Sequence, residues 1–204
     1  GLPGISVTMK AQEDDAIIQQ VNQDDLGVVT DAFQECFFEA LKQKAIENHE
    51  KAIATLESCE KIQPENAVIF FEKGKNYLAL EKHQQAVENL QKANRLEPNK
   101  EWVLVELMDA YSLNNQLDKA ILIAQSLIRF NSRYYEDLAN LYFASKEYDK
   151  LLALLDKLDA ELGVSEYRIG MRQQIFAFTN NTSGQIQALL DAPVFGVRWR
   201  WNSS

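Results

Sequence analysis

The residues best suited to catalysis in this 204-residue chain are two histidines and two cysteines. His49 and His83 are well separated in the sequence, and neither has a serine, cysteine or second histidine beside it in a nucleophile–base arrangement. The sequence contains no H-E-x-x-H, C-x-x-C or P-loop string, so motifs for metalloproteases, zinc sites and phosphate cradles are missing. We interpret both histidines as solvated, and we expect no catalytic residue, no metal site and no cofactor.

Paired carboxylates are the next candidates for acid–base chemistry. Asp14–Asp15 and Asp24–Asp25 are adjacent in the sequence and fall in an acidic N-terminal segment. Catalytic acid pairs need a fixed separation across a cleft. We therefore interpret these pairs as solvated charges of a flexible segment.

The two cysteines allow two interpretations. Cys36 and Cys59 fall on what we expect to be two successive helices, at positions that usually face a packed interior. Two separate buried thiols are the first interpretation, because cysteine behaves there as a small apolar residue. The alternative is a disulfide that joins the two helices, which requires an oxidising compartment.

Composition narrows the class of protein. Thirty acidic residues against 21 basic ones give a net charge of −9, a poor match to the clustered basic surface that nucleic acid requires. Glycine and proline are scarce, whereas alanine, leucine, glutamate, glutamine and lysine are abundant, which favours helices. The sequence has no run of about 18 apolar residues, so we expect no integral membrane segment and no nucleic-acid partner.

A repeating pattern organises the chain, and residues 66–99 carry its clearest copy. Small, aromatic and larger apolar residues recur there at helical spacing and end at a proline: Gly74, Tyr77, Ala86, Leu90, Ala93 and Pro98. A similar series lies one repeat length nearer the N-terminus, at Ala40, Gln43, Ala52, Leu56, Cys59 and Pro64. The corresponding positions one repeat length nearer the C-terminus are Met108, Tyr111, Ala120, Ala124, Leu127 and Ser132. Small residues at these positions let two antiparallel helices approach closely, and we expect Gly74 to face Ala86.

This pattern resembles the tetratricopeptide repeat, a 34-residue helix–turn–helix unit. The resemblance implies an all-α solenoid of antiparallel helix pairs that winds into a right-handed superhelix, without a β-sheet. We place the array at 31–191, with repeats at about 33–66, 67–100, 101–131, 132–165 and 166–191. The fourth repeat starts early, because Tyr142 follows Tyr111 at a shorter interval than Tyr111 follows Tyr77. The paired helices should break near Asn48, Glu81, Asn114, Lys146 and Asn181.

Both ends of the chain differ from the array. Thr30 and Asp31 can cap a first helix that we predict over about 31–47. Residues 1–30 are predicted to be a flexible acidic leader, with a short helix over 16–21 as the alternative. Residues 192–204 form an irregular aromatic and basic tail that fits no repeat.

The leader leaves the location of the protein open. Residues 5–12 resemble the end of a secretory signal peptide with Ala11 at the cleavage site, as in exported bacterial repeat proteins. Met9 could equally be the native start, after a cloning remnant at 1–8. Export is slightly favoured, and a cytoplasmic location is the alternative.

In the tetratricopeptide family the first helices of successive repeats line a concave groove that holds a peptide or a partner helix. The resemblance places the following residues along that groove: Phe37, Leu41, Phe71, Lys75, Trp102, Val105, Asp109, Glu136, Asn140, Tyr167 and Gln174. One family variant grips a terminal carboxylate with Lys, Asn and Arg. The corresponding positions here hold Phe37, Leu41, Phe71, Glu72, Trp102 and Glu106, so that clamp is absent, which argues against a chaperone carboxy-terminus as the ligand.

These aromatic residues either fill gaps between helices or form the apolar floor of a peptide groove. The groove alternative suits a segment with an aromatic or aliphatic anchor and flanking Lys or Arg. We therefore expect a non-enzymatic scaffold that binds a protein or peptide partner. The alternative is a structural or assembly module, or part of a longer array, that contacts partners or a second copy through its repeat ends.

Overall fold

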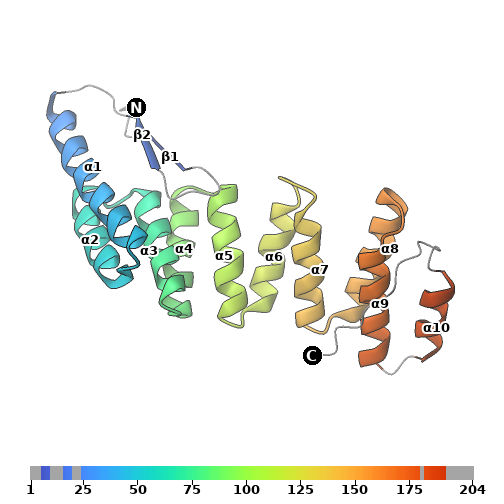
Figure 1. The fold of residues 1–204 in the computed structure, drawn as a ribbon. Helices are drawn as coiled ribbons and strands as arrows, with labels where there is room; N and C mark the ends of the chain where they lie inside the picture. Colours follow the sequence, from blue (N-terminus) through green and yellow to red (C-terminus); the bar gives the residue numbers. More distant parts are fainter. Residues whose placement is uncertain (1–5, 10–15, 20–23, 180–181, 192–204) are drawn as a thin grey trace. The chain divides into compact units, whose positions relative to one another are not determined.

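The computed structural model describes residues 6–9, 16–19, 24–179 and 182–191. In these ranges the chain forms ten helices in consecutive pairs, together with one pair of strands (Figure 1). The elements are β1 (Ser6–Met9), β2 (Ala16–Gln19), α1 (Asp24–Ala45), α2 (His49–Ile62), α3 (Ala67–Ala79), α4 (His83–Leu96), α5 (Glu101–Leu113), α6 (Leu117–Leu127), α7 (Tyr134–Ala144), α8 (Tyr148–Leu162), α9 (Glu166–Phe178) and α10 (Thr182–Leu190). The predicted all-α repeat fold with paired antiparallel helices is confirmed.

The chain divides into two compact units, Gly1–Tyr134 and Tyr135–Ser204. The first unit holds α1 to α6, and the second holds α8 to α10 and nearly all of α7. The division falls at the turn after α6. Helix α6 is three residues shorter than α2 and α4, the second helices of the two preceding repeats. This shortening explains the early start of the fourth repeat that the tyrosine spacing predicts.

The N-terminal segment differs from what the sequence predicts. Helix α1 begins at Asp24, so Thr30 and Asp31 lie inside the helix and do not cap it. Thr30 is buried there. The proposed short helix over 16–21 is also wrong, because Ala16–Gln19 forms strand β2, antiparallel to β1. This two-stranded sheet also contradicts the expectation of a fold without a β-sheet. The predicted cleavage site at Ala11 and the tail at 192–204 lie outside the described residues.

The turns within the pairs share one backbone geometry. A residue with positive φ occupies each of four turns: Glu47, Glu81, Asn115 and Lys146, with φ of 58° to 61°. The next residue donates its N–H to a carbonyl five residues earlier, as Asn48 does to Gln43 at 2.8 Å and Lys82 to Tyr77 at 2.9 Å. This arrangement satisfies the last carbonyls of the helix and reverses the chain. The breaks predicted near Asn48, Glu81, Asn114 and Lys146 are confirmed, and that near Asn181 lies outside the described residues.

Small residues set the spacing between α3 and α4, as the sequence pattern predicts, but with a different partner. The atoms nearest to an added Cβ at Gly74 belong to Leu90, with Cγ at 2.5 Å and Cδ2 at 2.8 Å, and not to Ala86. Leu90 and Ala86 are both fully buried. Leu90 therefore packs directly against the bare backbone of Gly74.

Gly74→Ala is expected to lower the free energy of unfolding by about 1–3 kcal/mol, since the new methyl group overpacks this contact. That loss outweighs the helix propensity gained, which is about 1 kcal/mol. Urea unfolding of the single variants and of Gly74→Ala combined with Leu90→Ala measures the coupling between the two positions. The double variant should lose less than the sum of the singles, and strict additivity would contradict the contact.

Two further contacts join α1 and α2 to their neighbours. Cys36 and Cys59 form a disulfide with Cα atoms 5.6 Å apart, so the interpretation as two separate thiols is wrong. His49 Nδ1 lies 2.9 Å from Asn76 Oδ1, and Asn76 is buried on α3. The interpretation of His49 as a solvated histidine is therefore wrong as well.

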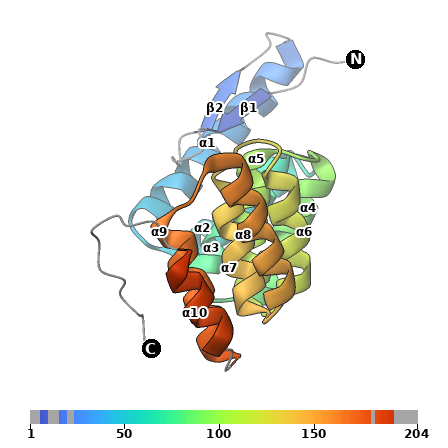
Figure 2. The ribbon, with the colours of Figure 1, turned by 90° about the vertical axis from the view of Figure 1, so that its right-hand side faces the viewer.

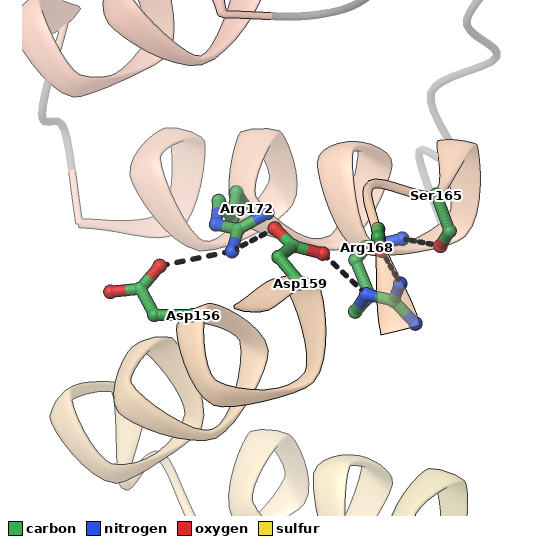
Figure 3. A network of polar contacts seen from close by, with 6 residues as sticks. Asp156, Asp159, Ser165, Arg168 and Arg172 are labelled. Atoms are coloured by element: carbon green, nitrogen blue, oxygen red, sulfur yellow. Dashed lines mark hydrogen bonds and ion pairs between the residues drawn. The ribbon is translucent and has the colours of Figure 1, made fainter. Parts of the chain in front are cut away.

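In the second unit, aromatic and charged contacts join the helices. Helices α7 and α8 follow one another in the chain (Figure 2), and the rings of Phe143 and Tyr148 are 5.8 Å apart across the turn between them. Helices α8 and α9 are joined by ion pairs, in which Asp159 accepts from Arg168 at 2.5 Å and from Arg172 at 2.6 Å (Figure 3). Asp156 is 3.0 Å from Arg172 in the same network. These ion pairs fix the last repeat against the preceding one.

Candidate functional site

The first helices of the first three repeats, α1, α3 and α5, lie in the first unit, and α3 contacts α5. Helix α3 begins after Asn66, whose side chain accepts a hydrogen bond from the N–H of Val68 at 3.1 Å. This cap fixes the helical phase of the residues that follow. We use the name first-helix surface for a set of residues from α3 and α5: Phe71, Lys75, Trp102, Val105, Glu106 and Asp109.

An aromatic pair lies at the centre of this surface. The rings of Phe71 and Trp102 are 4.6 Å apart and meet at 88°, edge to face. Phe71 is only 4% exposed, whereas Trp102 is half-buried. The Lys75 ammonium lies 5.0 Å from the centre of the Phe71 ring, a cation–π contact. The two rings are therefore in direct contact, and the indole is the partly accessible member of the pair.

A buried ion pair supports the surface from α1. Lys44 Nζ is 2.5 Å from Glu72 Oε2, and the two side chains are 8% and 1% exposed. Lys75 Nζ lies 3.9 Å from the other oxygen of Glu72. Both lysines therefore place positive charge beside a carboxylate that has almost no access to water.

Glu106 lies on α5, one turn after Trp102, and is half-buried. Burial raises the pKa of its carboxyl above the ordinary range, and the ammonium of Lys75 opposes that rise. The carboxylates of Asp109 and Glu72 raise the pKa further, and the ammonium of Lys44 lowers it by a smaller amount. The net direction is upward, which means that the ionised carboxylate at this position receives less stabilisation than it would in water.

Glu106→Gln is expected to raise the thermal midpoint at pH 7. The raised pKa means that the folded state favours the neutral carboxyl, so stability is lost as the pH rises from the unfolded-state pKa to the folded-state pKa. Below about pH 4 the carboxyl is protonated in the folded and unfolded states alike, and the difference should vanish there. Thermal melting of the wild-type chain and of Glu106→Gln between pH 3.5 and 8 tests the direction of this stability difference. A variant that is less stable than the wild type at pH 7 would contradict the prediction.

The other predicted positions divide between the two units. In the first unit Phe37 is fully buried against Phe33, with ring centres 5.6 Å apart, and Leu41 and Val105 are half-buried. Asp109 is exposed. Phe37 therefore fills space between helices, as one of the two alternatives for these aromatics predicts.

In the second unit the structure brings together Tyr167 and Asn140, whose hydroxyl and Oδ1 atoms are 3.1 Å apart. Burial raises the pKa of the Tyr167 hydroxyl, and the nearby Glu136 carboxylate adds to that rise. Glu136 and Asn140 are exposed on α7, and Gln174 is half-buried on α9. Tyr167, Asn140 and Glu136 therefore form a separate polar group.

The Lys44–Glu72 pair is not among the contacts that the sequence patterns above predict. The available signal was Glu72 and Glu106, which occupy the same position of successive repeats on a helix face that is otherwise largely apolar. A carboxylate recurring at such a position predicts a basic partner, because buried charges are normally paired. Within the described ranges no cluster of three or more His, Cys, Asp or Glu side chains could hold a metal ion. None of the helices described there is long and apolar enough to cross a membrane.

Comparison with known proteins identifies the repeat. Residues 67–100 match the tetratricopeptide repeat family model. No curated protein sequence matches the chain.

Three solved structures illustrate the likeness in fold. A crystal structure of MamA protein is 18% identical, with a TM-score of 0.64 over 80% of this chain and 90% of that one. YrrB, described as a TPR protein with an unusual peptide-binding site, is 15% identical, with a TM-score of 0.62 over 79% and 88%. The first TPR of Spaghetti (RPAP3), bound to the HSP90 peptide SRMEEVD, is 14% identical, with a TM-score of 0.52 over 56% and 95%. At these identities the likeness establishes the tetratricopeptide repeat fold.

Proposed function

We propose that this tetratricopeptide repeat protein is a non-enzymatic scaffold that binds a segment of a partner protein on the first-helix surface. The observation that carries the proposal is the half-buried Trp102 indole, held edge to face against the buried Phe71 ring. A rigid aromatic anchor of this kind is where binding energy usually concentrates. Charged side chains of Lys75, Glu106 and Asp109 belong to the same surface and can orient a ligand.

Relatives in fold support the proposal. YrrB is described as having a peptide-binding site, and the first TPR of Spaghetti was solved with a peptide bound. The clamp residues for a terminal carboxylate are absent here, because Glu72 and Glu106 are acidic. We therefore expect recognition of an internal segment through an apolar anchor.

Trp102→Ala is expected to weaken partner binding by at least about 2 kcal/mol, roughly thirtyfold, because the variant loses the apolar anchor. The fold should lose less than the roughly 3–5 kcal/mol typical of a truncated core aromatic, because the indole is only half-buried. Thermal melting measures the loss of stability. Capture of the partner from the source cell, followed by titration of the captured protein, measures the loss of binding.

Phe130→Ala is the matched control, since Phe130 is an exposed aromatic outside the first helices. It should leave binding unchanged. A partner retained at full strength by Trp102→Ala, or a stability loss of core size, would overturn the proposal.

A second candidate function is assembly through a repeat end. Helix α10 exposes three apolar side chains: Ile186 and Leu189, each 54% exposed, and Leu190, 73% exposed. A second copy of the chain could cover them. Sedimentation across a range of concentrations separates the two functions, because assembly predicts a mass that rises with concentration and is insensitive to Trp102→Ala.

A further inference from the structure

We infer that the segment bound on the first-helix surface carries a lysine or arginine whose cation pairs with Glu106. The inference rests on the proposed function and specifies the chemistry of the partner. It is carried by a comparison of two successive repeats of this chain, in which the same carboxylate position has two different surroundings.

In the second repeat the carboxylate receives its cation from the chain itself. Glu72 on α3 pairs with Lys44, which lies on the preceding first helix, α1, at 2.5 Å. The lysine is the last basic residue of α1, and its ammonium lies almost out of water beside Glu72. This pair shows how an ammonium is held at that position of the repeat.

The third repeat has a glutamate at the position of Glu72 but no lysine at the position of Lys44. Glu106 occupies the position of Glu72 one repeat later, whereas the residue one repeat after Lys44 is Leu78. Leu78 has no charge to offer, and it is half-buried on α3. Lys75 of α3 does act on Glu106, but its ammonium lies 3.9 Å from Glu72 Oε1 and over the Phe71 ring. Helix α3 therefore gives Glu106 no close ion pair like the one that Lys44 of α1 forms with Glu72.

The surroundings of Glu106 match a cationic ligand. Asp109 lies one turn further along α5 and adds negative charge, as the raised pKa of Glu106 also reflects. Trp102 lies one turn before Glu106, so its indole and the carboxylate occupy the same face of α5. An apolar anchor on Trp102 would thus place a neighbouring lysine or arginine of the same segment beside Glu106.

The probe is a phage-displayed library of random twelve-residue peptides, selected on the full chain. Selected peptides should share an apolar anchor and, at a fixed spacing from it, a lysine or arginine. Replacing that lysine by norleucine should weaken binding roughly tenfold on the wild-type chain, as expected for a hydrogen bond to a charged group. On Glu106→Gln the same replacement should change binding by less than about twofold, because the acceptor charge is gone.

Glu88→Gln is the matched control, since it removes one negative charge from the exposed face of α4 and leaves the first helices unchanged. It should retain the full tenfold effect. Thermal melting verifies that the variants are folded.

The remaining outcomes separate the two proposals. If no peptide is selected, or the selected peptides bind Trp102→Ala as well as wild type, the proposed function fails and this inference fails with it. If binding depends on Trp102 but the peptides lack a basic residue, or their basic residue is insensitive to Glu106→Gln, the inference alone is overturned.

Discussion

Replacing Lys44 by methionine is expected to lower the free energy of unfolding by about 3–5 kcal/mol, because it leaves the buried Glu72 carboxylate without its closest cation. Methionine keeps most of the apolar stem of lysine, so the loss reports the charge and not a cavity. Glu72 is 1% exposed and cannot recover the lost interaction from water. The Lys75 ammonium lies 3.9 Å from Glu72 Oε1 and replaces only part of the lost attraction. Urea unfolding followed by circular dichroism measures the loss.

Two further variants control this prediction. Lys51→Met removes an exposed lysine from α2 and should change stability by less than about 0.5 kcal/mol. Lys44→Met combined with Glu72→Met should recover most of the stability, since an apolar pair of similar volume can replace a buried ion pair. A loss below about 1 kcal/mol for Lys44→Met alone would show that the pair is not buried as described.

Reduction of the Cys36–Cys59 disulfide is the second large effect, with an expected loss of about 3 kcal/mol for a loop of this length. The two cysteines are 23 residues apart and join α1 to α2, so opening the loop frees the unfolded chain. Hydrogen exchange with and without reductant locates the loss. Amides of α1 and α2 should exchange faster after reduction, and amides of α8 and α9 in the other unit should not change.

The chain with serine at both cysteine positions is the control, and reductant should not alter its stability. Equal stability of the oxidised and reduced wild-type chain would contradict the prediction.

The sequence predicts the helical array well, because small and apolar residues recur at the same positions from one repeat to the next. Gly74 and Leu90 belong to that recurring set, and the structure places them in direct contact. The start of α1 could not be predicted in the same way. Thr30 and Asp31 read locally as a cap, but the helix extends to Asp24 and buries Thr30, so tertiary packing overrides the local preference.

The candidate site was only partly predictable for a related reason. The closeness of Phe71 and Trp102 follows from their helical phase and from the stacking of adjacent first helices. The Lys44–Glu72 pair and the disulfide depend on the exact rotation of α1 against its neighbours, and the periodic pattern does not encode that rotation. Burial of Phe37 depends on it as well.

The turns within the helix pairs have a consequence for how such a chain can change in length. At Glu47, Glu81, Asn115 and Lys146 the reversal is made by backbone hydrogen bonds to carbonyls of the helix that has just ended. These bonds use no side chain from another repeat, so a duplicated or deleted unit leaves every remaining turn with its own partners. Gene recombination can therefore lengthen or shorten the array in whole repeats without breaking the backbone bonds of the remaining turns.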